Sequence, residues 1–126
     1  MRALDTNVLV RLLTRDDIKQ QALAEAFIQG GAWISHLVLL ETLWVLDSVY
    51  SLGPKKIATA VGMLLDHQNL AVQEPNTVAA ALTQFRARPA LGFADCLILE
   101  VARKAGHIPV ATFDREFGKL DGTQKL

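Results

Sequence analysis

Four short apolar runs alternate in this chain with longer segments in which apolar residues recur at helical spacing, and this alternation restricts the possible folds most. The runs, which are the predicted strands, are Arg2 to Asp5, Ala32 to Ser35, Asn69 to Gln73 and Pro109 to Thr112. Strands that alternate with helices predict an α/β fold, in which a parallel sheet is covered by helices and joined by right-handed crossovers. The tail from Gly122 can add a fifth strand at an edge.

The segments between the runs carry start and stop signals of helices. The predicted helices are Thr6 to Thr14, Asp16 to Gly30-Gly31, Leu37 to Tyr50, a helix from Pro54, Pro75 to the residue before Pro89, and Gly92 to Ala105. Asp16 is the expected cap of the second helix. The sequence therefore predicts two successive helices in each of the three intervals between these strands.

Apolar residues at helical spacing predict which face of each helix is inward. In the second helix the predicted stripe contains Ile18, Leu23 and Phe27. In the last helix the residues expected inward are Phe93, Leu97, Ile98 and Val101, with Cys96 as a small core residue beside them. Packing is also the expected role of Trp33, Trp44 and Met63. The three histidines, His36, His67 and His107, lack metal-ligand spacing and are expected in loops or at the surface.

Length and composition limit the class of protein. A chain of 126 residues, of which 51% are apolar and 21% charged, is expected to form one domain over residues 1–126. Lys plus Arg and Asp plus Glu both total 13, so the zero net charge excludes a strong attraction of the whole molecule to nucleic acid. The single Cys excludes an internal disulfide, and no leader or membrane-spanning run is found. A cytoplasmic location is expected.

Four acidic residues stand where an α/β fold presents side chains to ligands. Asp5 and Asp114 each follow a predicted strand, and the carboxyl ends of parallel strands lie at the same rim of a sheet. Asp95 is in the first turn of a helix, where the macrodipole favours an anion. Glu41 is the one charge in the first ten positions of an apolar helix, and a carboxylate that faces a core needs a partner.

Carboxylates that gather in one pocket repel one another unless a cation supplies compensating charge. Oxygen ligands without a Cys/His cluster favour magnesium or manganese over zinc. Such ions polarise phosphate and lower the pKa of a bound water. The four acids therefore predict metal-assisted hydrolysis of a phosphodiester.

The acids lie in four motifs: Leu4-Asp5-Thr6-Asn7-Val8-Leu9, Ile34 to Glu41 followed by Trp44-Val45-Leu46, Phe93-Ala94-Asp95-Cys96-Leu97-Ile98, and Thr112-Phe113-Asp114-Arg115. In this order and spacing, they resemble the PIN-domain ribonucleases and, among these, the VapC-like toxins of type II toxin-antitoxin pairs. The resemblance covers essentially the whole chain. It implies a three-layer fold with a central parallel sheet of strand order 3-2-1-4-5, and a metal-dependent endoribonuclease.

The resemblance also implies roles for individual residues. Asp5, Glu41 and Asp95 match the three core acids of the family, and Asp114 matches its more variable fourth acid. These four are the expected catalytic residues and metal ligands.

Neighbours of the acids have supporting roles in this resemblance. Asn7 and Thr112 match polar residues that orient the acids or a water molecule, and Arg115 is the first candidate for a contact with the substrate phosphate. Glu116 stands where many relatives have Asp, and its longer side chain leaves it without an assigned role. Other arginines that could contact phosphate, or form a solvated face, are Arg11, Arg15, Arg86 and Arg88.

The partners implied by the resemblance are an RNA substrate, with tRNA and mRNA as candidate classes, a second copy in a homodimer, and a VapB-like antitoxin. The antitoxin would place a basic side chain in the acidic site. The apolar helix from Leu37 to Tyr50 is where contacts with such partners would fall.

Each acid also has a purely structural interpretation. Asp5 can be only a helix cap, and Asp95 a plain acid of a first helical turn. Glu41 can be a buried acid paired with an arginine, and Asp114 with Arg115 can form a surface ion pair. The four motifs together favour the catalytic interpretation.

Two other functions fit some of the same residues. A phosphatase or phosphotransferase with Asp5 as nucleophile also has an aspartate after the first strand, but Asn7 stands where many such enzymes have a second Asp. The third candidate is a catalytically inactive PIN-like module that only binds a partner, and the presence of all four acids argues against it.

Overall fold

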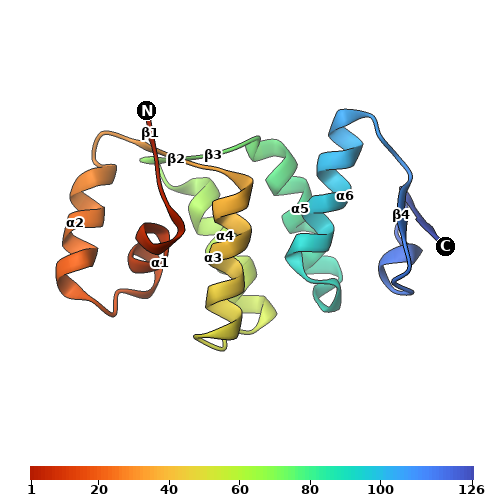
Figure 1. Cartoon of the computed structure of the whole chain (residues 1–126), viewed down its shortest axis with the longest axis horizontal. Helices are drawn as coiled ribbons and strands as arrows, with labels where there is room; N and C mark the ends of the chain where they lie inside the picture. Colours follow the sequence, from red (N-terminus) through yellow and green to blue (C-terminus); the bar gives the residue numbers. More distant parts are fainter. The chain divides into compact units, whose positions relative to one another are not determined.

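The structure is a computed structural model that describes all 126 residues. It divides into two compact units, Met1–Pro75 and Asn76–Leu126, and each unit combines helices with a small parallel sheet (Figure 1). Six α-helices alternate with five strands, which confirms the predicted α/β class. None of the helices has the length and apolar composition needed to cross a bilayer.

The first unit contains three strands and four helices. These elements are β1 (Arg2–Ala3), α1 (Thr6–Thr14), α2 (Ile18–Ile28), β2 (Ala32–Ile34), α3 (His36–Ser48), α4 (Pro54–Asp66) and β3 (Leu70–Val72). The strands form a parallel sheet in the order β1-β2-β3, which agrees with the 3-2-1 part of the predicted order. In Figure 1 the three strands run along one edge of this unit, and α1, α3 and α4 lie on one side of them.

The two faces of this sheet differ in burial. Ala32 and Ile34 of β2 are fully buried, whereas Trp33 between them is 37% exposed. In register with Trp33 on that second face are two alanines, Ala3 of β1 and Ala71 of β3. Trp33 therefore packs only in part and lies outside the core, because β2 turns its even-numbered side chains toward the helices.

The second unit contains the rest of the chain. Its elements are α5 (Pro75–Ala87), η1 (Pro89–Leu91), α6 (Phe93–Ala105), β4 (Val110–Thr112), η2 (Phe117–Lys119) and β5 (Thr123–Lys125), with the first residue of α5 still in the first unit. The strands β4 and β5 are parallel, so the fifth strand predicted from the tail is present. The pairing of β1 with β4, which the order 3-2-1-4-5 also requires, stays a prediction.

The second unit has a small core of its own. Leu99 of α6 packs with Phe117 and Leu120, and the half-buried Leu91 and Val110 lie against them. The rings of Phe85 and Phe93 meet edge to face with centroids 5.9 Å apart. This core holds β4 and the turn after it against α6.

The buried faces of α2 and α6 differ from the predicted ones. In α2 the buried residues are Ala24 and Ile28, whereas Ile18 and Leu23 of the predicted stripe are 84% and 72% exposed. In α6 the buried residues are Phe93, Cys96, Leu97 and Leu99, whereas Ile98 and Val101 of the predicted face are exposed. Both helices are apolar over more than one face, so spacing alone did not show which face packs inward.

The cap of α2 was also predicted at the wrong residue. The side chain of Asp17 accepts a hydrogen bond from the backbone N–H of Gln20, at 3.0 Å. Asp16 instead accepts hydrogen bonds from the hydroxyl groups of Tyr50, at 2.7 Å, and Thr14, at 2.9 Å. Asp17 therefore caps α2, because the carboxylate of Asp16 is already bound to Tyr50 and Thr14, which are not part of this helix.

Candidate active site

Asp5 lies at the carboxyl end of β1 and is the N-cap residue of α1. Its backbone is extended, and its Oδ1 accepts a hydrogen bond of 2.8 Å from the N–H of Thr6. The side chain is exposed, and Oδ2 has no protein partner. Asp5 can therefore be both a helix cap and a metal ligand, because the cap uses one carboxylate oxygen and leaves the other for a ligand.

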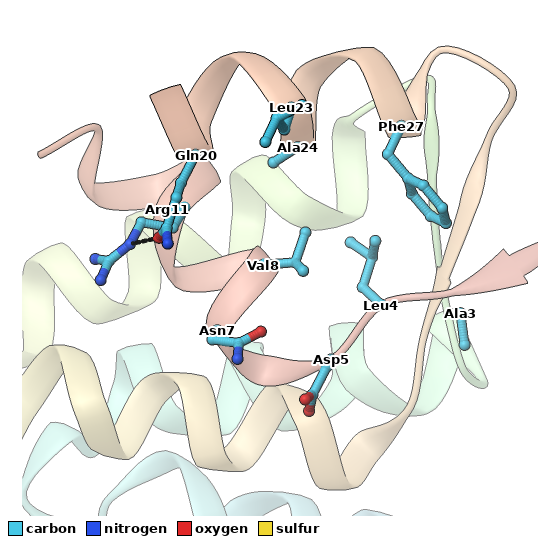
Figure 2. Close-up of a pocket in the computed structure, with 10 residues that line it drawn as sticks. All are labelled: Ala3, Leu4, Asp5, Asn7, Val8, Arg11, Gln20, Leu23, Ala24 and Phe27. Carbon is cyan, nitrogen blue, oxygen red and sulfur yellow. Dashed lines mark hydrogen bonds between the residues drawn. The ribbon is translucent and has the colours of Figure 1, made fainter. Parts of the chain in front are cut away.

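Asp5 and Asn7 border a cavity of about 490 Å³ between α1 and α2, which we call the α1–α2 groove (Figure 2). The residues that line it are Ala3, Leu4, Asp5, Asn7, Val8, Arg11, Gln20, Leu23, Ala24 and Phe27. In Figure 2, Arg11 and Phe27 lie at opposite ends, Leu23 and Ala24 lie across from Asn7, and the carboxylate of Asp5 points away from Phe27. The first of the four predicted acids thus adjoins a mainly apolar hollow.

Glu41 is exposed on α3 and forms no salt bridge. The expectation that it faces the core is wrong, and so is the alternative of a buried acid paired with an arginine. The buried residues of this helix are Leu39, Thr42, Leu43 and Leu46. An outward carboxylate avoids the cost of desolvation and remains available to a cation.

The exposed face of α3 around Glu41 is apolar. Leu37, one turn before Glu41, is 81% exposed, and Trp44, one turn after it, is 67% exposed. Packing within this chain, the expected role of Trp44, is therefore not what the structure shows. Met63 of α4 is also exposed.

Asp95 lies in the first turn of α6 and is half-buried. Burial raises the pKa of its carboxyl group above the ordinary value, and the negative charge of Asp114 raises it further. Neither acid forms a salt bridge with a basic side chain. The second unit therefore holds two neighbouring carboxylates whose mutual repulsion no side-chain cation compensates.

Cys96 follows Asp95 and is fully buried, as predicted. Burial, and then the charges of Asp95 and Glu100, raise the pKa of the thiol to about 11. The group is therefore a neutral thiol at physiological pH and packs as a small apolar side chain.

Asp114 lies two residues after the end of β4, and its carboxylate caps the turn that follows. Its Oδ1 accepts a hydrogen bond of 2.8 Å from the N–H of Phe117, at the start of η2. Its own backbone N–H donates to Oγ1 of Thr112, at 3.0 Å. Thr112 therefore acts on Asp114 through the backbone of the turn.

The residues after Asp114 carry the remaining charges of this turn. Arg115 is exposed and forms no salt bridge, so the alternative of an Asp114–Arg115 ion pair is wrong. Glu116 accepts a hydrogen bond from Nζ of Lys119, at 3.1 Å. Arg115 is thus the cation of this turn that is available to a ligand.

Arg11 is engaged within the protein. Its Nε donates to Oε1 of Gln20, at 2.6 Å, and its Nη1 donates to Asp16, at 3.0 Å, with Tyr50 Oη at 3.5 Å. Arg15 lies 3.8 Å from Glu25, whereas Arg86 and Arg88 are exposed and form no salt bridge. Of the arginines proposed to contact phosphate, Arg11 and Arg15 are therefore already paired with neighbouring side chains, whereas Arg86 and Arg88 are not.

The predicted site residues are thus brought together in two groups, Asp5 with Asn7 and Asp95 with Asp114 and Thr112. Within neither unit do three or more His, Cys, Asp or Glu side chains lie close enough to hold a metal ion. The sequence analysis considered Asp5 as a helix cap, which the bond from the Thr6 N–H confirms, but it missed the backbone N–H of Phe117, which orients Asp114. The signal for Phe117 was present, because an aspartate three residues before an N–H is a common capping arrangement.

A comparison with models of protein families assigns this chain to a family. The model of the family described as PIN domain matches residues 2–123, which is nearly the whole chain. No curated protein and no solved structure shows a significant match. The chain therefore belongs to the PIN-domain family, whose members are generally nucleases that use divalent metal ions.

Proposed function

We propose that this protein is a metal-dependent endoribonuclease that hydrolyses RNA phosphodiester bonds, and that residues 1–126 act as one nuclease domain. The proposed catalytic residues and metal ligands are Asp5, Glu41, Asp95 and Asp114. The observation that carries the proposal is the half-buried Asp95, whose pKa is raised by burial and by the charge of Asp114. Because neither acid has a basic partner in the protein, we propose that a bound cation compensates their charge in this PIN-domain chain.

The side chains fit a hard divalent ion. Asp5 and Asp114 each bind a backbone N–H through Oδ1, which fixes the carboxylate and leaves Oδ2 free. Glu41 is exposed and unpaired. Carboxylate oxygens are the ligands that magnesium and manganese prefer, so we propose one of these two metals as the cofactor.

In the proposed mechanism a divalent ion, when bound, polarises the phosphate and favours deprotonation of the attacking water. Asp5, Glu41, Asp95 and Asp114 would hold this ion through their carboxylate oxygens. Asn7 orients the attacking water beside Asp5, and Thr112 fixes the turn that carries Asp114. Arg115 binds a neighbouring phosphate, since its guanidinium group is exposed and unpaired.

We further propose the role of a VapC-like toxin, with tRNA or mRNA as substrate, in the cytoplasm. An acidic site without a protein cation favours a partner that supplies a basic side chain, as a VapB-like antitoxin would. Exposed Leu37 and Trp44, on either side of Glu41, offer apolar area for this antitoxin or for a second copy in a homodimer.

The proposed function is tested by incubating the purified chain with a pool of structured RNA and either Mg²⁺ or Mn²⁺. Cleavage is expected with either ion and is expected to stop when a chelator is added. The matched inactive variant is Asp95→Asn, which keeps the shape of the side chain and removes its charge. Cleavage that persists in the chelator or in this variant contradicts the proposed site.

The same samples distinguish the two other functions. A phospho-aspartate at Asp5, detected by mass spectrometry after exposure to a phosphoryl donor, would assign the chain to the phosphatases or phosphotransferases. Metal-independent binding of RNA without cleavage would assign it to the inactive binding modules.

A further inference from the structure

We propose that the α1–α2 groove binds one nucleobase of the RNA next to the bond that is cut, and so sets the sequence preference of cleavage. This inference rests on the proposed nuclease function. Its starting point is position, because Asp5, a proposed metal ligand, is itself part of the groove wall. A nucleotide whose phosphate lies at Asp5 has its base within reach of this hollow.

The size and walls of the groove suit a flat heterocycle. A volume of about 490 Å³ is in the range of small-ligand pockets. The apolar walls come from Val8 of α1 and from Leu23, Ala24 and Phe27 of α2 (Figure 2). Single-stranded RNA bases bind to such surfaces by stacking on aromatic rings and packing against aliphatic side chains.

The groove also presents amide groups that can pair with the edge of a base. The side chain of Asn7 has no protein hydrogen bond and carries both a donor and an acceptor, so one of these groups can orient the attacking water while the other pairs with a base. Gln20 uses Oε1 to accept from Arg11, which leaves its Nε2 as a free donor. An apolar side chain of a protein partner would leave these amides unpaired, whereas a base can satisfy them.

Positive charge at both ends of the groove favours a ligand with phosphates. At one end the guanidinium of Arg2 lies 3.8 Å from the centroid of the Phe27 ring, and Arg2 forms no salt bridge. At the other end is Arg11, whose charge is partly compensated by Asp16. A nucleotide in the groove would therefore have the unpaired cation Arg2 near a phosphate at one end, and at the other end Arg11, which is already engaged by Gln20 and Asp16.

The test uses variants of residues that lie in the groove wall but outside the proposed catalytic machinery. Leu23→Ala removes an exposed apolar wall, and Phe27→Leu removes the aromatic face while keeping an apolar side chain. The matched control is Ile18→Ala, which truncates an even more exposed side chain of the same helix that does not line the groove. Thermal melting of all three checks that they fold.

The readout is the distribution of cleavage sites in an RNA pool of random sequence. The wild type is expected to prefer one kind of base at a fixed position beside the cut. Leu23→Ala and Phe27→Leu are each expected to reduce this preference about tenfold and to raise KM with little change in kcat, since stacking and apolar contacts are lost. The Ile18→Ala control is expected to keep the wild-type preference.

Several outcomes would overturn the inference. If the wild type cuts RNA but the two groove variants keep its preference, the groove does not bind the base, and the proposed nuclease function still stands. Equal cleavage beside all four bases in the wild type has the same meaning. A change from dimer to monomer in light scattering of Leu23→Ala, with unchanged preference, would assign the groove to a second copy of the chain.

Failure of the proposed function looks different. In that case the wild type does not cut the pool, and the Asp95→Asn variant does not bind a fluorescent single-stranded oligonucleotide in an anisotropy titration. Both the function and the inference would then be wrong.

Discussion

At the scale of single residues, Asp5 and Asp114 combine two roles that are usually considered alternatives. Each uses Oδ1 to cap a helical turn and keeps Oδ2 free of protein partners. The cap restricts rotation of the carboxylate, so a ligand that needs the second oxygen finds it already oriented. Structural and catalytic interpretations of these acids therefore do not exclude each other.

This dual role predicts different effects for two substitutions of Asp5. Asp5→Asn keeps a good capping side chain but loses the charge, so we expect loss of RNA cleavage with little change in stability. Asp5→Ala loses both and is expected to cost about 1 kcal/mol of unfolding free energy as well. Urea unfolding and cleavage assays on the two variants check this. Equal stability of the two variants would show that the cap contributes nothing.

Thr42 gives a second prediction at this scale. Its side chain is fully buried in α3, and its Oγ1 has no hydrogen-bond partner. Thr42→Val replaces the hydroxyl with a methyl group of similar size, so we expect a gain of about 1 kcal/mol in the free energy of unfolding. The control is Thr59→Val, since the Thr59 hydroxyl is exposed and donates to Lys55 O at 3.0 Å. A destabilised Thr42→Val variant would contradict the expectation.

At the scale of the elements, polar contacts join the end of α3 to the loop between α1 and α2. Asp16 in the loop accepts hydrogen bonds from Tyr50, Thr14 and Arg11. These contacts lower the pKa of Asp16 below its ordinary value of 3.8, and the hydrogen bond from Tyr50 contributes most. The loop beside the α1–α2 groove is thus held by charge-assisted bonds from two directions.

The lowered pKa gives a prediction with a defined sign. A carboxyl group whose pKa is lower in the folded state stabilises the fold above its unfolded pKa, and this stability is lost as the pH falls through the folded value. Tyr50→Phe removes the main cause of the shift, so we expect a lower urea midpoint at pH 7. The difference from wild type is expected to shrink as the pH falls below 3.8. A difference that does not depend on pH would mean that Tyr50 acts through packing alone.

The order of elements could be predicted from the sequence, but the buried faces could not. Apolar runs, prolines and glycines mark where each strand and helix begins or ends, and these signals are local. Which face of α2 is buried depends on its packing against α1, and Leu23 and Ala24 are both apolar choices for that contact. The pairing of Asp16 with Tyr50 joins residues 34 positions apart, so nothing in the loop itself indicated that Asp17 would be the cap.

At the scale of the whole molecule, the sequence indicates candidate site residues but not the environment in which the fold places them. The positions of acids after β1 and after β4 follow from the strand pattern. The exposure of Glu41 and the burial of Asp95 depend on how each helix packs, which spacing did not show. Proximity of Asp95 to Asp114 likewise arises from the fold of the second unit, where α6 packs near the turn after β4.

The proposed role of Asp95 as a metal ligand gives the final prediction, in which Asp95→Asn has opposite effects with and without the ion. Without metal, the variant removes a half-buried charge that Asp114 repels, so we expect its melting temperature to equal or exceed that of wild type. With Mg²⁺ or Mn²⁺ at hundredfold excess over the dissociation constant, wild type is expected to gain about 2.7 kcal/mol by linkage. The variant is expected to gain much less, because it has lost a ligand, so the order of the two melting temperatures should reverse. Differential scanning calorimetry with and without chelator measures all four values, and equal metal-induced shifts in the two proteins would show that Asp95 does not bind the ion.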